Sequence, residues 1–404
     1  MLALPHEFAP IEAERLRLRV VGPDDVDAIH AVQSRDDVCR YLPFAPRTRD
    51  QVAEKVAVWA RGDALRADGD IVMLAIERRS DQAVLGHIHA ALSSVENASA
   101  EVGWALHPDF AGQGFANEAA RALLRELFGR VGVHRVFAWV QPENLASAAL
   151  CRRLGMRIEA ERENFGWLRG GWRSLQVWAI LDREFAAAEA GAPTPVAPDF
   201  VRTVPYGTQA RPAPDPALPA EFSGIRTERL RLRLLTTEDV DAVHRYQSRE
   251  DVCRYLLFEP RDRETVAAKL AEHAVHTTLA ARGDYWQLAV ERLDDGALIG
   301  DLYFALTDPE GGVAEIGWTF HPEAHGQGFA TEAARAMLEL AFGELRLSRV
   351  VAELDPRNER SITLCQRLGL VEEAHFVEDL FFKGDWASTG AYARLAPAPP
   401  SPVE

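Results

Sequence analysis

The sequence has few cysteines, no long hydrophobic run and no excess of basic residues. Its four cysteines among 404 residues form no C-x-x-C pair, which argues against a zinc or redox motif. No apolar run approaches the ~20 residues of a membrane-spanning helix. The first ten residues also lack the basic start and apolar core of a secretory signal. We therefore expect a cytoplasmic protein with reduced, buried thiols, no metal and no membrane partner.

The charge balance limits the choice of partners further. The formal net charge is -16, which disfavours direct binding to nucleic acid. An acidic surface attracts cationic amines, although many inert soluble proteins are equally acidic. The hydrophobic content of 47% and the charged content of 26% are typical of a soluble globular protein, and the length suggests two or three domains.

One stretch of the sequence occurs twice, 214 residues apart. Residues 101–121 read EVGWALHPDFAGQGFANEAAR and residues 315–335 read EIGWTFHPEAHGQGFATEAAR, with 14 of 21 positions identical. Residues 14–47 align with residues 228–261 without a gap, at 23 of 34 identical positions. A period of this length is too long for a solenoid, so it indicates the duplication of a whole domain.

The repeat predicts four regions. They are an N-terminal domain at 1–186, a Pro/Ala-rich linker at 187–220, a C-terminal domain at 221–395 and a disordered tail at 396–404. The linker composition is typical of an extended, semi-rigid segment. We expect the two copies to pack as an intramolecular pseudo-dimer, so that the chain itself would be a monomer.

Hydrophobic periodicity predicts the same elements in each copy, in the order β-α-α-β-β-β-α-β-α-β-β. In the first copy, strands are predicted near 15–21, 71–77, 84–92, 101–106, 135–140, 156–165 and 172–181. Helices are predicted near 23–34, 48–66, 115–128 and 143–154. The fold class is therefore α/β, and the strand-turn-helix-strand unit favours a parallel crossover.

The repeated stretch itself predicts a strand, a tight glycine turn and a helix. His107 and Pro108 end the strand, because proline cannot donate to a β-ladder. The glycines at 112 and 114 allow a sharp turn before the helix that begins near Phe115. Such a turn exposes unpaired N–H groups at the positive end of a helix dipole, which predicts a site for phosphate or pyrophosphate.

This combination of motifs resembles the acetyl-CoA signature of the GCN5-related N-acetyltransferase (GNAT) superfamily. It is most similar to the RimJ/RimL-type branch, which acetylates the N-termini of ribosomal proteins. The resemblance implies two tandem GNAT-like domains, each a mixed, mostly antiparallel sheet flanked by helices, with acetyl-CoA as the acyl donor. It also implies that the turn residues hold the pyrophosphate of coenzyme A, namely Gly112, Gln113, Gly114, Phe115 and Ala116, and Gly326, Gln327, Gly328, Phe329 and Ala330.

The chain departs from the family pattern at one position of each turn. The pattern opens with Gln or Arg, whereas this sequence has Ala111 in one copy and His325 in the other. The departure is expected to remove a side-chain contact to the coenzyme, so that the backbone N–H groups alone bind the phosphate.

Acetyl transfer to an amine needs an unprotonated amine, a polarised carbonyl, a stabilised oxyanion and a proton for the leaving thiolate. Glu101 and Glu315, at the start of the repeated strand, are candidates for the base. A partly buried carboxylate there would have a raised pKa and would accept the amine proton directly or through water. The family often gives a glutamate on this strand that role. The alternative is an exposed strand glutamate or a salt-bridge partner, and the sequence does not decide between them.

Two further pairs lie where a strand leads into a helix, in PENLAS and PRNERS. They are Asn144 and Ser147 in the first copy and Asn358 and Ser361 in the second. Residues of these types often cap helices. The resemblance implies a second role, in which the asparagine contacts the pantetheine arm and the serine hydroxyl protonates the coenzyme A thiolate.

Other repeated residues are interpreted as structural first. Tryptophans 104 and 318 are expected in the core and cysteines 151 and 365 inside a helix. Histidines 107 and 321 are expected in turns, with a role as proton carriers as the alternative. Tyr41 and Tyr255 lie between the first two helices, where they face a substrate or pack between the helices. The second of these alternatives is favoured.

The sequence thus predicts an acetyl-CoA-dependent N-acetyltransferase that transfers acetyl directly to a primary amine. The acceptor is either a protein N-terminus or a small amine such as a polyamine, an amino acid or an antibiotic. The alternative is an acyl-CoA-binding or interaction module in which one or both copies are inactive. A third possibility is that one copy is catalytic while the other shapes the substrate site.

Overall fold

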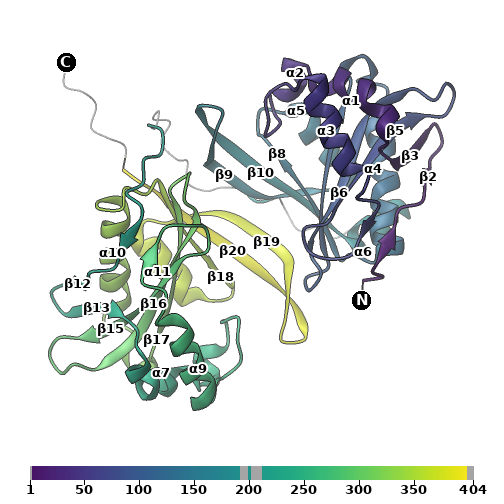
Figure 1. The fold of residues 1–404 in the computed structure, drawn as a ribbon. Helices are drawn as coiled ribbons and strands as arrows, with labels where there is room; N and C mark the ends of the chain where they lie inside the picture. The colour runs from purple at the N-terminus through teal and green to yellow at the C-terminus, as the bar shows by residue number, and fades with distance from the viewer. Residues whose placement is uncertain (1, 192–198, 202–211, 398–404) are drawn as a thin grey trace, which may run out of the picture. The chain divides into compact units, whose positions relative to one another are not determined.

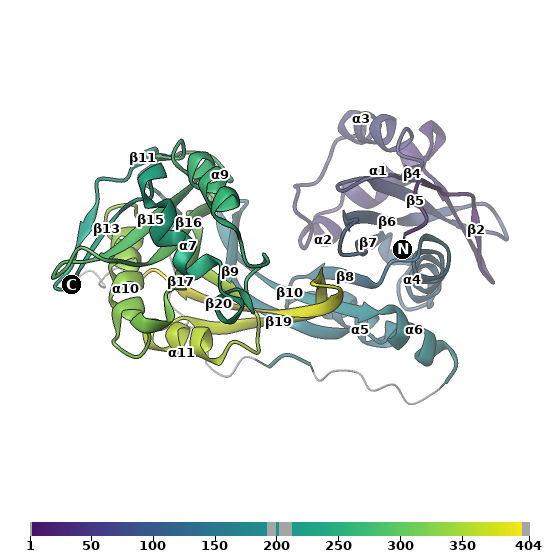
Figure 2. The same ribbon diagram turned by 90° about the horizontal axis from the view of Figure 1, so that it is seen from below.

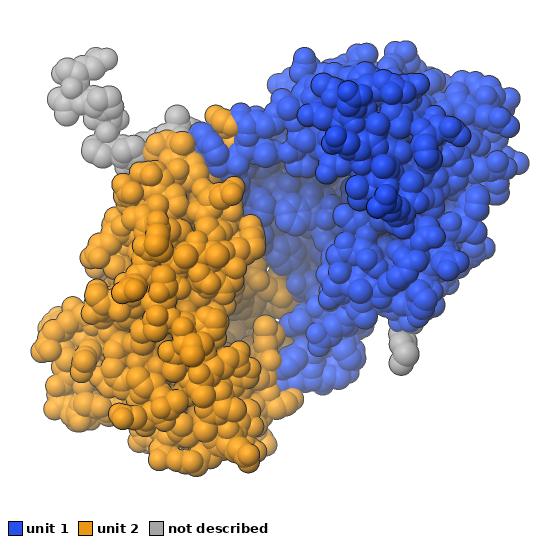
Figure 3. Space-filling view, in the orientation of Figure 1, with its two compact units in different colours: residues 1–169, 173–201, 376–387 blue, residues 170–172, 202–375, 388–404 orange. Residues whose placement is uncertain are grey.

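The computed structural model describes residues 2–191, 199–201 and 212–397. The chain divides into two compact units (Figure 3). The first comprises residues 1–169, 173–201 and 376–387, and the second comprises residues 170–172, 202–375 and 388–404. Each unit is therefore built mainly on one copy of the repeat. Residues 192–198 and 202–211 of the predicted linker, and 398–404 of the predicted tail, lie outside the described residues.

The first copy contains one large sheet, drawn in purple to teal in Figure 1. In their order across the sheet its strands are β2 (Ile11–Glu12), β3 (Leu16–Val20), β5 (Ile71–Arg78), β6 (Val84–Ser94), β7 (Ser99–Leu106), β8 (Arg135–Val140), β10 (Gly171–Leu181) and β9 (Arg157–Leu168). A separate pair joins β1 (His6–Glu7) to β4 (Ala64–Leu65). The helices are α1 (Val26–Gln33), α2 (Asp36–Cys39), α3 (Arg49–Trp59), α4 (Phe115–Glu126), α5 (Leu145–Leu154) and α6 (Asp182–Glu189).

The second copy repeats this arrangement with one helix fewer in its described part. Its sheet runs β12 (Ile225–Arg226), β13 (Leu230–Leu234), β15 (Tyr285–Arg292), β16 (Leu298–Asp308), β17 (Val313–Phe320), β18 (Arg349–Leu354), β20 (Asp385–Leu395) and β19 (Val371–Phe382). The strands β11 (Ala220–Glu221) and β14 (Thr278–Leu279) form a separate pair. The helices are α7 (Val240–Gln247), α8 (Glu250–Cys253), α9 (Arg263–His273), α10 (Phe329–Phe342) and α11 (Glu359–Leu368). No helix in the described ranges is long and apolar enough to span a membrane.

The predicted fold class and element order are confirmed, with one helix predicted too long. The helix predicted over 48–66 ends at Trp59, because Leu65 is fully buried and the segment Ala64–Leu65 pairs with β1 as a short strand. The helix α6, which follows the last strand of the first copy, was not predicted. It reaches Glu189 and so extends past the expected boundary at residue 186.

Each sheet is covered by helices on both faces, as Figure 2 shows for α1 and α3 on one side of β5 and β6 and for α4 on the other. Apolar side chains along β5 contribute to both layers, because successive side chains of a strand point to opposite faces of the sheet. Leu74 and Ile76 belong to the core under α4 and α5, whereas Met73 and Ala75 pack with α1 and α3. The second copy divides its core between α10 and α7 in the same way.

The sheet of each copy opens between two parallel strands. β7 and β8 pair in parallel at only three positions, from Ser99↔Arg135 to Glu101↔Phe137, and then diverge although both continue. β17 and β18 do the same and end their pairing at Glu315↔Val351. The predicted parallel crossover is confirmed. The divergence leaves a wedge whose apex carries a glutamate in each copy.

Candidate functional site

The glycine turn of the first copy leads into α4 with two residues in the left-handed region. Gly112 has φ 74° and Gly114, which caps α4, has φ 81°, a conformation that glycine adopts without a steric penalty. Within the part of the chain that the structure describes, the backbone N–H groups of residues 112–116 donate to no protein acceptor. The turn is exposed, and a Cβ at position 112 would meet no atom within 4 Å. This arrangement fits a phosphate group, because unused N–H donors of an exposed turn lie beside a helix N-terminus.

A residue that the sequence analysis missed holds this turn in place. Arg15 donates from Nη1 to the carbonyl oxygen of Gln113 at 3.1 Å and from Nε to Glu118 Oε2 at 2.7 Å, and its guanidinium lies over the Phe115 ring at 4.6 Å. The second copy repeats every contact with Arg229, Gln327, Glu332 and Phe329. The repetition of this Arg and Glu at the 214-residue offset was the signal available in the sequence.

The side chains beside the two turns differ. In the second copy, Arg360 in the first turn of α11 donates from Nη1 to His325 Nδ1 at 3.0 Å. Burial and the neighbouring Arg360 lower the pKa of His325, so the guanidinium carries the positive charge of this pair. The first copy has Ala111 and Ala146 at the equivalent positions. The second turn therefore has a nearby side-chain cation that the first turn lacks.

Glu315 lies at the apex of the second wedge and is half-buried. Burial raises its pKa to about 7, and the neighbouring charge of Glu353 on β18 acts in the same direction. A carboxylate that titrates near neutral pH is well matched to accepting a proton from an amine. The raised pKa that was expected for a partly buried glutamate is thus present in this copy.

Glu101 lies at the apex of the first wedge, with a different neighbour. His89 on β6 places Nε2 3.7 Å from Glu101 Oε1. The imidazole lies over Gly103, where a Cβ would approach its Cε1 to 2.4 Å. The glycine of the E-x-G-W motif therefore makes room for the ring beside the glutamate.

The serine of each copy is held by the tryptophan of the repeated strand. Trp104 Nε1 donates to Ser147 Oγ at 3.3 Å, and Trp318 Nε1 donates to Ser361 Oγ at 3.1 Å. Because each indole N–H occupies an acceptor position of the hydroxyl, the serine proton remains able to donate elsewhere. The tryptophans are half-buried, so the expectation of a purely core role understates their contact with the serine.

The asparagines cap their helices, which was one of the two alternatives. The Asn144 side-chain oxygen accepts from the Ser147 backbone N–H at 3.1 Å, and Asn358 makes the same contact with Ser361 at 3.2 Å. The cap uses only the oxygen of each amide. The side-chain NH₂ group is still available to a ligand carbonyl, so the two roles are compatible.

The remaining candidates agree with structural roles. His107 accepts from the Asp109 backbone N–H at 3.4 Å, as a turn residue does, and His321 does the same toward Glu323 at 3.2 Å. All four cysteines are buried and lie outside any disulfide, and burial raises the pKa of Cys151 to about 12, which argues against a nucleophile. Tyr41 is half-buried, and its carbonyl accepts from Gln141 Nε2 at 3.4 Å.

Each copy thus combines an exposed backbone cradle, a glutamate at a wedge apex and a serine hydroxyl at a helix N-terminus. The cradle can hold a phosphorylated carrier, the glutamate can take a proton, and the serine can give one. Within the described residues no cluster of side chains suited to a metal ion is present.

Comparison with known proteins identifies a family that matches both copies and several relatives of the chain. The acetyltransferase (GNAT) domain family model matches residues 15–157 and 229–371. The uncharacterized N-acetyltransferase p20 of Bacillus licheniformis is 31% identical over 149 residues, which cover 37% of this chain and 83% of that protein. The spermidine N(1)-acetyltransferase of Escherichia coli is 27% identical over 157 residues, covering 39% and 81%. The putative ribosomal N-acetyltransferase YdaF of Bacillus subtilis is 27% identical over 159 residues, covering 39% and 86%.

Proposed function

The chain belongs to the GNAT family of N-acetyltransferases, whose domain it carries twice, and we propose that both copies transfer an acetyl group from acetyl-CoA directly to a primary amine. The observation that carries this proposal is the repeated wedge. In each copy the parallel strands part directly after a glutamate, and the helix that follows the first of them begins at a glycine turn with unused N–H donors. A module that had lost catalysis would need only the turn.

We assign acetyl-CoA binding to the two turns and to the asparagines. The backbone N–H groups of 112–116 and 326–330 would hold the pyrophosphate, because they lie at an exposed glycine turn beside a helix N-terminus and are unused within the described structure. The side-chain NH₂ groups of Asn144 and Asn358 would donate to the pantetheine arm. When bound, acetyl-CoA supplies the acetyl group as a thioester, which leaves the amine attack and the proton transfers to the protein.

The proton transfers follow from the two side chains at the wedge. The carboxylate of Glu315, or of Glu101 in the first copy, takes the proton that the amine nitrogen must lose when it forms the amide bond. The hydroxyl of Ser361 or Ser147 gives a proton to the departing sulfur. The N-terminal end of the helix on which the serine lies favours negative charge at that point. No covalent bond between the acetyl group and the enzyme is required.

The acceptor is an amine of one of two classes. One relative is named for spermidine and another for ribosomal proteins, so a polyamine and a protein N-terminus are both candidates. The acidic net charge of -16 favours a cationic small amine. We place the reaction in the cytoplasm, because four buried cysteines that lie outside any disulfide fit a reducing compartment.

Calorimetric titration of the intact chain with acetyl-CoA, followed by an acetylation assay with a panel of primary amines, tests this proposal. We expect a stoichiometry near two and amine-dependent release of coenzyme A. Acetyl-CoA binding without acetylation of any amine or peptide N-terminus would support the binding-module alternative instead.

A further inference from the structure

The two copies differ in a set of side chains that lie on the same face of the sheet as the proposed base. In the second copy, four residues on consecutive strands β15 to β18 form this set, which we call the acceptor row: Tyr285, Tyr303, Glu315 and Glu353. The register places them on one face, because Tyr285 and Glu315 both pair with Ala305, and Tyr303 pairs with Gly317. Their counterparts in the first copy are Ile71, His89, Glu101 and Trp139.

The row of the second copy is acidic and aromatic. The Tyr285 and Tyr303 rings lie 5.5 Å apart between centroids, and His276 stacks on Tyr285 at 4.1 Å. Glu353 follows Val351, which is the parallel partner of Glu315, so the two carboxylates flank the opening of the wedge on neighbouring strands. Their mutual repulsion contributes to the raised pKa of Glu315.

A positive charge relieves this repulsion. An ammonium group between two carboxylates is favoured by both, and the faces of tyrosine rings attract cations as well. An acceptor that carries a second cationic nitrogen can therefore occupy the row while its reacting nitrogen lies at Glu315.

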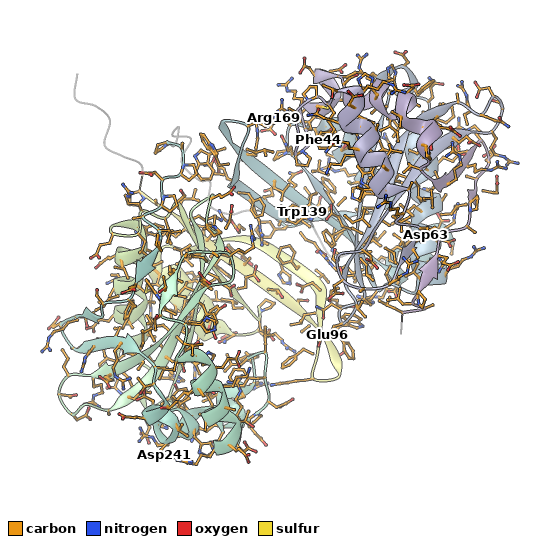
Figure 4. The ribbon with its side chains drawn as sticks, viewed as in Figure 1. Phe44, Asp63, Glu96, Trp139, Arg169 and Asp241 are labelled. Atoms are coloured by element: carbon orange, nitrogen blue, oxygen red, sulfur yellow. The ribbon has the colours of Figure 1, made fainter. Side chains whose placement is uncertain are left out.

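The row of the first copy has a different character. Trp139, labelled in Figure 4, replaces Glu353 and is 46% exposed. Its ring contacts those of Phe137 at 6.5 Å and Phe165 at 5.6 Å, where the second copy has Val351 and Asp379. This row contains one carboxylate, that of Glu101, and the His89 imidazole lies 3.7 Å from it. The other two members of the row, Ile71 and Trp139, are apolar.

We infer that the two copies acetylate different amines: the second copy takes an amine with a further positive charge, and the first takes an amine attached to an apolar or aromatic group. This inference rests on the proposed function and extends it, because it assigns a class of acceptor to each site. Glu353 and Trp139 are the residues that determine the difference.

The test uses the full chain with one proposed base removed at a time. Glu101→Gln leaves the second copy active, and Glu315→Gln leaves the first. The amines are 1,4-diaminobutane, butylamine and 2-phenylethylamine, of which the first two differ mainly by one ammonium group. We expect the Glu101→Gln chain to prefer 1,4-diaminobutane over butylamine by about tenfold or more in kcat/KM. The Glu315→Gln chain should prefer 2-phenylethylamine over butylamine by a similar factor.

Variants of the row separate recognition from folding. Adding Glu353→Gln to the Glu101→Gln chain should bring its ratio for 1,4-diaminobutane over butylamine close to one, mainly through KM, and Glu353→Asp should restore the preference in part. Adding Trp139→Ala to the Glu315→Gln chain should remove its preference for 2-phenylethylamine, and Trp139→Phe should keep it. Equal amine preferences in the two single-base chains would overturn the inference while leaving the proposed function intact.

A failure of catalysis is distinguished by direct binding. If no amine is acetylated, the proposed function fails, and calorimetry with 1,4-diaminobutane then decides the inference. Binding that Glu353→Gln weakens, and that Trp139→Ala leaves unchanged, would support an acceptor row of the kind described. No binding, or binding insensitive to Glu353→Gln, would contradict it.

Discussion

The two copies are closely alike where the chain turns into α4 and α10 and differ on the sheet face that carries the acceptor rows. The turns share the sequence GQGFA and the same arginine clamp, built on Arg15 or Arg229. Across the acceptor rows only the glutamate is common to both. Backbone donors need one geometry to bind one phosphate group, whereas recognition of an acceptor depends on side chains that each copy can change separately.

A buried position next to each acceptor row, on the same face of the sheet, also differs. In the first copy, His87 bonds to Gln33 at 2.9 Å and is fully buried, which lowers its pKa to about 3. In the second copy the same position is Asp301, which accepts from the Tyr246 hydroxyl at 2.5 Å and from Gln287 at 2.6 Å. Burial raises the pKa of Asp301 to about 6. One fold thus accommodates a neutral imidazole or a carboxyl group at the same place.

The largest effect is expected from the proposed bases. Glu315→Gln should lower the second copy's kcat/KM by about 10²- to 10⁴-fold, the usual contribution of a positioned general base. Before substitution, the rate of this copy should rise with pH and level off above about 7, because the carboxylate must be unprotonated to accept a proton. Two titratable groups, Tyr303 and Glu353, face Glu315. Burial and the charge of Glu353 raise the pKa of Glu315, and burial and the charge of Glu315 in turn raise the pKa of Tyr303.

The pH profile is measured in the Glu101→Gln chain, with Glu264→Gln on the exposed part of α9 as a matched surface control. An unchanged rate in Glu315→Gln across the pH range would refute the assignment of the base.

The glycine turns should give the next largest effect. Proline requires φ near −65°, whereas Gly114 and Gly328 both have φ 81°. Gly328→Pro should therefore distort the second cradle and weaken its acetyl-CoA binding by roughly 100-fold or more, equivalent to about 3 kcal/mol. Calorimetry should then show a stoichiometry near one, and Gly114→Pro should show the same for the other copy. A stoichiometry that stays near two in either variant would contradict the role of the turns.

The buried titratable groups should make the stabilities of the two copies depend on pH in opposite directions. Asp301 has a folded pKa of about 6, above its unfolded value, so its contribution is present below about pH 4 and is lost as the pH rises toward 6. The change amounts to about 3 kcal/mol. His87 has a folded pKa of about 3, below its unfolded value, so its contribution is present above about pH 6.5 and is lost as the pH falls.

Hydrogen exchange of peptides from β5–β6 and β15–β16 between pH 4 and 6.5, corrected for intrinsic rates, measures both trends in one chain. Asp301→Asn should weaken the trend in the second copy, where Glu315, with a pKa of about 7, contributes in the same direction. His87→Gln should weaken the opposite trend in the first copy. These variants leave the charged or titratable neighbours unchanged. The neighbours of His87 are Arg47 and His89, and those of Asp301 are Tyr246 and Arg261. Parallel trends in the two copies would contradict this prediction.

The smallest effect is expected beside the cofactor turn of the second copy. Arg360→Ala should weaken its acetyl-CoA binding about fivefold, or about 1 kcal/mol, since it removes an exposed cation near a phosphate site. The reverse change, Ala146→Arg, offers a gain of affinity in the first copy. Isothermal titration in the Gly114→Pro and Gly328→Pro backgrounds separates the two sites. Equal affinities before and after Arg360→Ala would show that the side chain does not reach the coenzyme.

The sequence predicted the fold and the cofactor end more completely than the acceptor end. The glycine turn and the parallel crossover follow from local patterns that occur twice, whereas the place of the glutamate at the wedge depends on the register of β7 with β8 and of β17 with β18. The helix predicted over 48–66 was too long, because the strand Ala64–Leu65 exists only through its pairing with β1, far along the chain. Periodicity within one segment carries no information about such a partner.

The acceptor row could not be predicted because its members come from four strands. His89 and Tyr303 become neighbours of the glutamates only through the register of β6 with β7 and of β16 with β17. The duplication did offer a signal, since the same position is Trp139 in one copy and Glu353 in the other. Without the register, that difference could not be connected to the wedge.

The central claim, that one chain holds two acetyltransferase sites with different acceptors, is tested most directly by a mixed-substrate assay on the unmodified protein. The chain is given saturating acetyl-CoA with 1,4-diaminobutane, with 2-phenylethylamine, and with both together, each amine at about its KM for the copy that prefers it, and the release of coenzyme A is followed. Two separate sites predict a rate with both amines close to the sum of the two single rates. A combined rate well below this sum would mean that the amines compete for the same sites, and would contradict the account.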